Sequence, residues 1–334
     1  MSLKDSIKQL RKREHITLDE LFRRLGFSRG KVIDNPTAES SSAFQYAFGN
    51  GNAYKLSSEQ SKELEKLIPW ARLFPIRALQ KMGHIPANAK DANLVYAILH
   101  FMNVGSIEGF NNFYSATLHT TNPQTYAAWI RLGELRVNRT SVDFKPDRDA
   151  IFANLKFLRT NAFFHRDDVR ELARDVLQSC GIEYIEVEPF MTTPSPICAF
   201  YWRGYRPVVQ FTTTKMEDSK YIEALFHAIA HGLFHPLRTS CLQVGTAAQQ
   251  TQTNNGTAEI QNIQEIEAST FAQDMVLSEA EECELICCGN FSERRCIQHF
   301  SGLFRVRPGI LVERLQQQGK IRRRSPLNDF KIAV

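Results

Sequence analysis

Long apolar runs are missing from this sequence. No stretch approaches the roughly 20 apolar residues that a membrane-spanning helix needs. The first residues alternate charged and apolar side chains where a signal peptide has an unbroken apolar segment. We therefore expect a cytoplasmic protein without a membrane segment. The 334 residues are enough for about two or three domains of ordinary size.

Cysteine is scarce, and the net charge is low. Seven cysteines in so long a chain are odd in number and far less dense than in a disulfide scaffold, which indicates reduced thiols. The formal net charge is +5, but residues 1–35 contain nine lysines and arginines against five aspartates and glutamates. This local excess of positive charge favours a partner that carries phosphate groups.

The first 33 residues predict three short helices. Thr17 to Glu20 has the pattern of a capping box, and Gly26 ends the helix that begins there. With a first helix over residues 18–25 and a recognition helix over 28–33, the spacing is similar to a helix-turn-helix of the Cro/repressor type. Such a motif would contact DNA through Arg23, Arg24, Ser28, Arg29 and Lys31. A basic helical hairpin that packs on the next domain is an equally weighted alternative.

Helical patterns dominate the middle of the chain, and a sheet is expected after them. Turn-forming residues at both ends of 34–52 indicate a linker or an extended loop, whereas apolar residues recur at helical spacing from about residue 57 to 177. Alternating patterns then predict strands over residues 182–187, 197–202 and 207–211. Further helices are predicted over residues 219–235, 263–277, 278–286, 292–300 and 308–317.

These patterns predict an α+β protein with three regions. Residues 1–56 would hold the helix-turn-helix region and a linker, residues 57–145 a helical middle region, and residues 146–334 a small domain with a metal site. In that domain we expect a short antiparallel sheet packed on the metal-site helix and on further helices. Residues 238–262 have almost no charge and predict a long loop at the rim of the site.

A pair of histidines in a predicted helix is the strongest chemical signal. His227 and His231 are four residues apart, so both imidazoles leave the helix on one side and reach a common metal ion. Zinc peptidases with an H-E-x-x-H motif have such a pair, and their glutamate takes the proton from the attacking water. Here that position is Ala228. The alternative is that both histidines are satisfied core residues.

A third ligand is expected from the helix predicted over residues 263–277. We assign it to Glu267, because the apolar face of that helix would carry it toward the histidines, and Glu265 on another face is the weaker candidate. The apolar face consists of Ile263, Ile266, Phe271 and Met275. His235 is roughly 12 Å from His227 by helix rise, so we expect it behind a ligand or at the substrate.

A rival set of metal-binding residue types lies nearer the C-terminus. Its spacing is tolerable for a metal site, but no second paired motif accompanies it, so buried or idle thiols are the preferred interpretation. The set comprises Cys283, Cys287, Cys288, Cys296 and His299.

Several motifs in a fixed order resemble one known family, the ImmA/IrrE-type metallo-endopeptidases, in the version that follows a HigA-like helix-turn-helix. The similarity covers roughly residues 70–330. The residues that carry it are Phe74–Ile76, Ala127–Glu134, Leu172–Ala173, Leu225–His235, Glu267–Ala268, Phe271–Ala272, Pro308–Gly319 and Leu327–Asn328.

The resemblance implies a zincin-like domain, a zinc ion held by His227, His231 and Glu267, and cleavage of a DNA-binding repressor or antitoxin protein. Such enzymes control genes of the stress response, mobile elements or toxin-antitoxin systems. The family motif has glutamate where this chain has Ala228. General acid-base help is worth about 10²–10⁴ in rate, so we predict no useful hydrolysis from this chain.

Two functions stay open at this point, and a homodimer is compatible with both. The first is a regulatory endopeptidase whose base has been replaced, which we favour because the three expected ligands remain and alanine perturbs a helix least. The second is a DNA-binding transcription regulator or antitoxin with a natural pseudo-peptidase domain that senses or binds a protein.

A peptide substrate would pair with the strand predicted over residues 207–211, because zincins hold an extended peptide at a sheet edge. This strand contains Pro207, Val208, Val209, Gln210 and Phe211. His235 and Tyr201 are candidates for stabilising the oxyanion, and structural roles for both are equally open.

Overall fold

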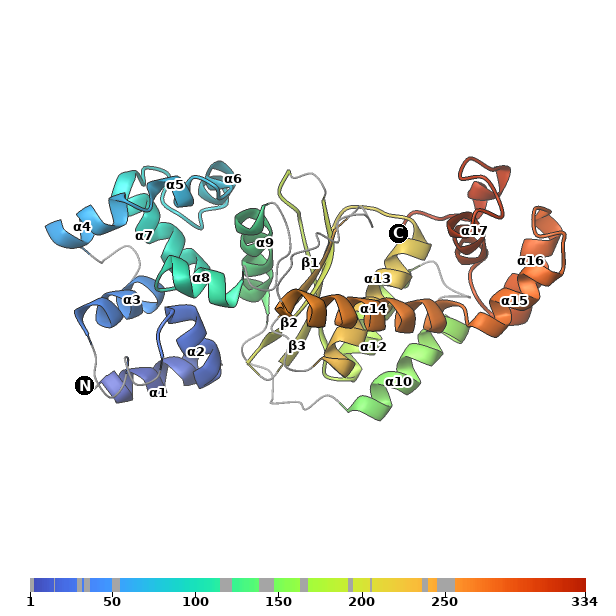
Figure 1. Ribbon diagram of the computed structural model, residues 1–334, viewed down its shortest axis with the longest axis horizontal. Helices are drawn as coiled ribbons and strands as arrows, with labels where there is room; N and C mark the ends of the chain where they lie inside the picture. Colours follow the sequence, from blue (N-terminus) through green and yellow to red (C-terminus); the bar gives the residue numbers. More distant parts are fainter. Residues whose placement is uncertain are drawn as a thin grey trace. The chain divides into compact units, whose positions relative to one another are not determined.

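The computed structural model shows an α+β protein with many helices and one four-stranded sheet (Figure 1). It describes residues 3–14, 16–28, 32, 37–49, 55–114, 122–137, 147–162, 168–191, 195–204, 206–235, 240–244 and 256–334. Among the helices within these ranges, none combines the length and the apolar character needed to cross a bilayer. The α+β class predicted from the sequence is therefore confirmed.

Two compact units make up the chain. The first comprises residues 1–143, 189–196 and 202–205, and the second comprises residues 144–188, 197–201 and 206–334. Helices on both sides of residue 56 pack together within the first unit, because α2 contacts α8 and α3 contacts α7. The helices of the first unit are α1 (Leu3–Glu14), α2 (Leu18–Leu25), α3 (Ala38–Phe48), α4 (Ser58–Glu65), α5 (Ile68–Ala71), α6 (Ile76–Lys81), α7 (Asp91–Met102), α8 (Ile107–Phe113) and α9 (Pro123–Arg136).

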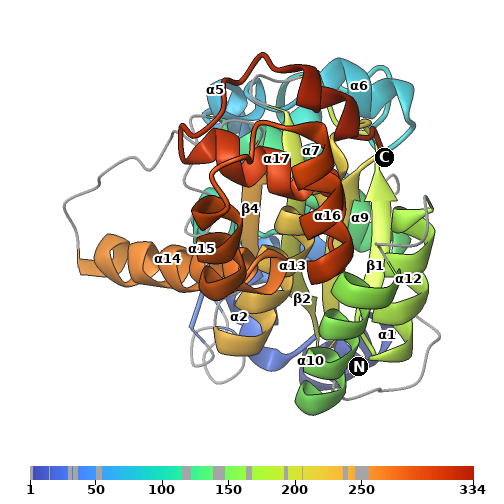
Figure 2. The ribbon, with the colours of Figure 1, turned by 90° about the vertical axis from the view of Figure 1, so that its right-hand side faces the viewer.

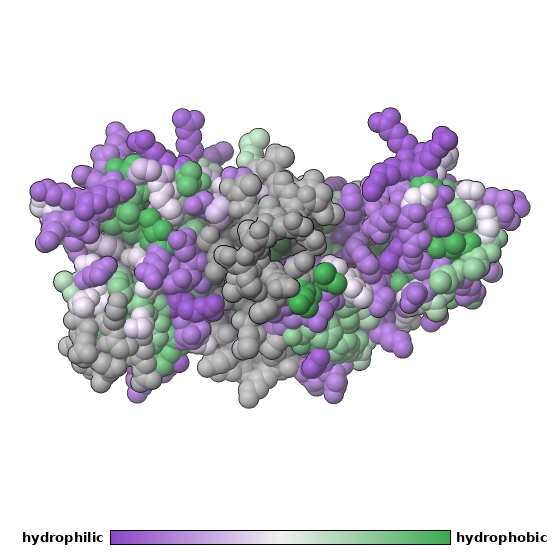
Figure 3. All heavy atoms as spheres, in the orientation of Figure 1, coloured by the Kyte–Doolittle hydropathy of each residue, from purple (hydrophilic) through white to green (hydrophobic). Residues whose placement is uncertain are grey.

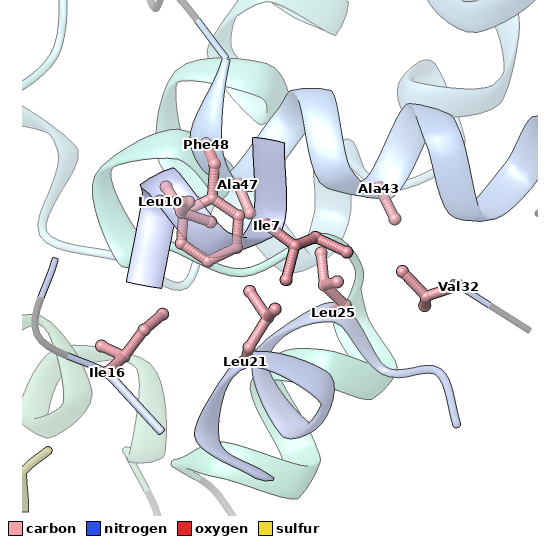
Figure 4. Close-up of a cluster of buried hydrophobic side chains, with 9 residues drawn as sticks. All are labelled: Ile7, Leu10, Ile16, Leu21, Leu25, Val32, Ala43, Ala47 and Phe48. Atoms are coloured by element: carbon pink, nitrogen blue, oxygen red, sulfur yellow. The ribbon is translucent and has the colours of Figure 1, made fainter. Parts of the chain in front are cut away.

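The first three helices surround a small apolar core (Figure 4). Helix α2 has the bounds that its sequence predicts: the Thr17 side chain accepts a hydrogen bond from the backbone N–H of Glu20, and Gly26 ends the helix in the left-handed conformation. The core consists of Ile7, Leu10, Ile16, Leu21, Leu25, Val32, Ala43, Ala47 and Phe48. Most of the predicted recognition helix, including Arg29 and Lys31, lies outside the described residues.

Helix α3 lies inside the segment that was predicted to be a linker, and that prediction is wrong. Thr37 and Ser40 form a complete capping box at its start. Ala43 and Ala47 then recur at a four-residue spacing and are buried in the core. The turn-forming residues that flank this segment therefore mark the ends of a short helix, which the serine-rich composition between them conceals.

The second unit holds the predicted metal-site helix and, apart from the ends of β2, the sheet. Its strands are β1 (Glu183–Val187), β2 (Pro196–Arg203), β3 (Arg206–Thr212) and β4 (Ser240–Val244). Its helices are α10 (Arg148–Phe157), η4 (Leu158–Ala162), α12 (Val169–Ser179), α13 (Asp218–Phe234), α14 (Gly256–Val276), α15 (Glu279–Cys287), α16 (Arg294–Phe304), α17 (Pro308–Gln317) and η5 (Pro326–Phe330).

The sheet has the strand order β1-β3-β2-β4, and β1 runs parallel to β3. The predicted purely antiparallel sheet is therefore wrong. Strands β2 and β3 are consecutive in sequence and are neighbours in the sheet. The neighbour of β1 is β3 and not β2, and the pair that β1 and β3 form is parallel. Strand β4 lies within residues 238–262, which were predicted to form one long loop, and the start of α14 also falls there.

Helix α13 has a close contact near each end, the first with the residue before α17 and the second with the sheet. Near its start, Asp218 forms an ion pair of 2.6 Å with Arg307, and both side chains are buried. Near its end, a side chain at Gly232 would meet the ring of Phe200 at 2.6 Å, so only glycine permits this close approach of helix and strand. In Figure 2, α12 lies beside β1, in agreement with their contacts, and α14 crosses α13 and packs against it.

Candidate metal centre

Three histidines lie in a row along α13. His227, His231 and the residue that ends the helix, His235, are spaced four residues apart, which places them on one side of the helix. The side chain of His231 is only 1 % exposed, and that of His227 is 13 % exposed. The neighbouring ring nitrogens of His227 and His231, both Nε2, are 2.9 Å apart. The two imidazoles therefore converge on one point.

Helix α14 adds a carboxylate to this point. Oε2 of Glu265 lies 3.2 Å from Nε2 of His227 and 3.5 Å from Nε2 of His231. The three side chains form a group whose ligand atoms all lie within 4.8 Å of one another. Two imidazole nitrogens and one carboxylate oxygen are the donor set of a catalytic zinc site, which leaves a fourth position for water or substrate.

The spacing of these three atoms fits a small divalent ion. Zinc binds imidazole nitrogen and carboxylate oxygen at about 2.0–2.2 Å, so neighbouring ligand atoms of a tetrahedral site are roughly 3.3–3.5 Å apart. The observed separations of 2.9, 3.2 and 3.5 Å are close to these values. Small rotations of the imidazole rings would bring the shortest separation to the tetrahedral value.

Glu265, and not the predicted Glu267, completes this group. The first part of the predicted apolar face of α14 does not pack on α13: Ile263 and Ile266 are 51 % and 53 % exposed, and apolar side chains are visible at the surface over this helix in Figure 3. Farther along the helix, Phe271 does contact α13, with its ring centre 5.2 Å from that of Phe234. The buried face instead carries Ala268 and Ala272. Because these side chains are small, the backbones of α13 and α14 can approach closely, and Glu265 is on this face.

Glu267 has a different partner. Its Oε2 lies 2.8 Å from Nε2 of His235, and Nδ1 of His235 lies 3.1 Å from Nδ1 of His231. His235 therefore lies behind a proposed ligand, which is one of the two positions expected for it from the sequence. The other ligand has its own contact, since Nδ1 of His227 lies 3.3 Å from Oγ of Ser269.

Ala228 occupies the position of the missing base and is buried in α13 at 1 % exposure. Its methyl group can neither accept nor donate a proton. The residues that could hold a metal are therefore together in this structure, and the group that would activate an attacking water in an H-E-x-x-H enzyme is absent from position 228.

No protein-family model, curated protein or solved structure matches this chain. The resemblance to the ImmA/IrrE-type peptidases thus rests on the sequence motifs alone, and the argument for function rests on the geometry of the site.

The predicted substrate strand cannot bind a peptide through its backbone. Residues Pro207–Phe211 belong to β3, which lies between β1 and β2 in the sheet and so has a neighbour on each side. Tyr201 also has an internal role, since its hydroxyl donates a hydrogen bond of 3.0 Å to the side chain of Gln210 and both residues are buried. The strands at the two ends of the sheet order are β1 and β4.

Arg24, one of the predicted DNA contacts of the first unit, is not available to DNA. The side chain of Arg24 is fully buried and pairs with Glu20 at 3.0 Å and with Glu134 at 2.7 Å, so it cannot reach a phosphate. Arg23 is partly exposed and forms a longer ion pair of 3.7 Å with Asp19. Ser28 is exposed.

The cysteine-rich set does not form a metal group. Within the part of the chain that the structure describes, the side chains that converge as a possible metal group are those of His227, His231 and Glu265. Cys288 and Cys296 form a pair with their sulfur atoms 3.1 Å apart. Cys283 and Cys287 are exposed thiols on α15.

Proposed function

We propose that the second unit is a zinc-binding domain of the metallo-endopeptidase type that lacks its general base. The observation that carries this proposal is the convergence of His227, His231 and Glu265 from two packed helices. Two nitrogen donors and one oxygen donor match the three ligands that a protein supplies to a catalytic zinc ion. When bound there, zinc would act as a Lewis acid on the carbonyl group of a peptide.

The chain's own residues would hold the metal but would not complete the hydrolysis. Accepting a proton from the attacking water and returning it to the leaving amine needs a carboxylate at position 228. Loss of such a group typically lowers the rate by about 10²–10⁴. We therefore expect a protein that binds zinc and substrate and cleaves its substrate at a negligible rate.

The substrate that the resemblance implies is a DNA-binding repressor or antitoxin. An extended segment of such a protein would add to an end strand of the sheet, through backbone hydrogen bonds. We place it on β4 (Ser240–Val244), since this strand ends the sheet order and contacts the metal-site helix α13. This replaces β3 as the proposed substrate strand.

A second candidate function follows from the same residues. A metal group that keeps its three ligands without the base is also expected of a natural pseudo-peptidase, which would bind a protein and leave regulation to DNA contacts of the first unit. The burial of Arg24 removes one predicted DNA contact from this alternative. We therefore favour the endopeptidase type.

Metal analysis of the purified chain tests the ligand assignment. We expect about one zinc ion per chain, lost in His231→Ala and in Glu265→Ala because each removes a donor. His299→Ala is the matched control, since His299 is an exposed histidine on α16 in the same unit. A metal-free wild-type protein, with the two imidazoles sharing a proton beside Glu265, would refute the proposal.

Restoring the base separates the two functions. Ala228→Glu should cleave a helix-turn-helix repressor of the class that the resemblance implies at one defined bond. Ala228→Gln has the same size and polarity but cannot accept the proton, so it should not cleave. If zinc-loaded, folded Ala228→Glu leaves the repressor intact while the wild-type chain binds DNA in a salt-sensitive and sequence-specific way, the regulator is the correct function.

A further inference from the structure

Two contacts continue from the metal group to the surface of the second unit. Nδ1 of His231 faces Nδ1 of His235 at 3.1 Å, and Nε2 of His235 faces Oε2 of Glu267 at 2.8 Å. The side chains of His231 and His235 are 1 % and 5 % exposed, whereas that of Glu267 is 57 % exposed. A line of polar contacts thus runs from a buried ligand to an exposed carboxylate.

The positions of the protons along this line follow from the metal site. A histidine that binds a metal through Nε2 is neutral and carries its proton on Nδ1. His231 therefore donates from Nδ1 to Nδ1 of His235, which must be unprotonated. His235 then carries its proton on Nε2 and donates it to the carboxylate of Glu267. Each contact has one donor and one acceptor, and no other assignment of neutral rings satisfies both contacts.

We propose that Glu267 and His235 are positioning residues that fix the tautomer and orientation of the ligand His231. This inference rests on the proposed metal site, and it gives Glu267 a role different from that of a ligand. Without the carboxylate, His235 loses the acceptor for its Nε2 proton. It can then place the proton on Nδ1, where it would face the proton of His231. Two donors facing each other would turn the ligand ring away from the metal.

The second ligand provides an internal comparison. Nδ1 of His227 has a hydroxyl, Oγ of Ser269, at 3.3 Å, which is a longer and neutral contact. Hydrogen bonds to a charged acceptor are roughly twice as strong as neutral ones. The support of His231 through His235 and Glu267 should therefore matter more for metal affinity than the support of His227 through Ser269.

The zinc affinity of the full chain, measured by competition with a chelator, tests this inference. Groups behind a ligand typically change metal affinity by about 10–100-fold, and we expect a loss of that size in Glu267→Ala. In Glu267→Gln the amide oxygen can still accept the proton from Nε2, although more weakly than a carboxylate, so this variant should lose clearly less affinity than Glu267→Ala. Asp274→Ala removes another exposed carboxylate from α14 and should have no effect.

Nitrogen NMR of the imidazole rings supplies a readout that a purely structural role would not change. In the zinc-loaded wild-type chain, His231 should be protonated on Nδ1 and His235 on Nε2. In Glu267→Ala the signals of His235 should indicate a mixture of both tautomers. In Glu267→Gln they should match the wild type.

The possible results point to different errors. A wild-type chain that binds no zinc would refute the metal site itself. A wild-type chain that binds zinc, together with a Glu267→Ala variant of equal affinity, would refute the positioning role and leave the metal site intact. Equal losses of zinc affinity in Glu267→Ala and Glu267→Gln would also overturn the positioning role. The negative charge of Glu267, and not its ability to accept a hydrogen bond, would then be responsible for the affinity.

Discussion

The buried ion cluster around Arg24 permits a sharp test of the first unit. Its guanidinium group lies 2.7 Å from Glu134 and 3.0 Å from Glu20, and its central carbon lies 3.7 Å from the ring centre of Phe113. Methionine at this position would keep a long side chain but remove the charge and the hydrogen-bond donors. Glu134 would then keep its ion pair with Arg131 at 2.7 Å.

The expected cost follows from the desolvation of the remaining carboxylates. Removing one partner of a buried ion pair costs about 3–5 kcal/mol, and Arg131 should keep Arg24→Met in the lower part of this range. For a urea m-value of about 2 kcal/mol/M, the unfolding midpoint falls by roughly 1.5–2 M. Arg23→Met is the matched control. An exposed pair such as Arg23–Asp19 contributes about 0–1 kcal/mol, which corresponds to a shift of at most about 0.5 M.

Tryptophan fluorescence is the appropriate assay, because all three tryptophans, Trp70, Trp129 and Trp202, belong to the first unit. Equal midpoints for Arg23→Met and Arg24→Met would refute the burial argument. A DNA-contacting Arg24 would give another pattern, in which stability is unchanged and the salt dependence of DNA binding becomes weaker.

Three further predictions concern other parts of the chain. Gly232→Ala should destabilise the second unit by about 1–3 kcal/mol, because its methyl group would overlap a phenylalanine ring. Gly302→Ala is the control and should not destabilise the unit, because its methyl group would meet nothing within 4 Å. Thermal unfolding followed by circular dichroism compares the two variants. Burial raises the pKa of Glu134, but the guanidinium groups of Arg24, Arg131 and Arg203 outweigh it and lower this pKa to about 2. The stability that Glu134 contributes should thus be present above about pH 4.5 and be lost as the pH falls through about 2, in an acid titration of tryptophan fluorescence. Mild peroxide should join Cys288 and Cys296, whose sulfur atoms are 3.1 Å apart, with loss of two hydrogens and release of water, and peptide mass mapping would identify a wrong pairing.

Local signals in the sequence were sufficient for most of the elements. Helix α2 begins after a threonine cap and ends at a glycine with φ of +79°, and both features are properties of single residues. Strand β1 is rich in aromatic and β-branched residues, and helix α13 repeats apolar residues at helical spacing, so both were predicted within one or two residues.

Strand order and the faces of helices depend on partners that are distant in sequence. Strand β3 has the composition of any buried strand, and nothing within it indicates that β1 will pair with it on one side. Position in the sheet decides whether a strand can accept a peptide, so the predicted substrate strand was wrong although its bounds were nearly right. Strand β4 was missed because its residues lie in a polar segment without a clear alternation.

The face of α14 shows why hydrophobicity alone pointed to Glu267, whereas Glu265 lies with the two histidines. Large apolar residues were assumed to point inward, yet Ile263 and Ile266 are exposed while Ala268 and Ala272 are buried. Close contact between two helices favours small side chains, because a large one holds the backbones apart. A pattern of alanines four residues apart was the signal in the sequence that would have identified the buried face, and with it Glu265.

The two carboxylates of α14 differ in the kind of contact that they make, and this difference assigns their roles. Glu265 and Glu267 leave the helix about 200° apart, yet both reach histidines, because the row on α13 extends over two turns and α14 packs against α13. One oxygen of Glu265 faces two nitrogens at once, at 3.2 and 3.5 Å, as ligands around a common ion do. Glu267 faces a single nitrogen at 2.8 Å, which is the geometry of a hydrogen bond. In the proposed metal site, the same helix would therefore supply a ligand and, two residues later, the acceptor that orients another ligand.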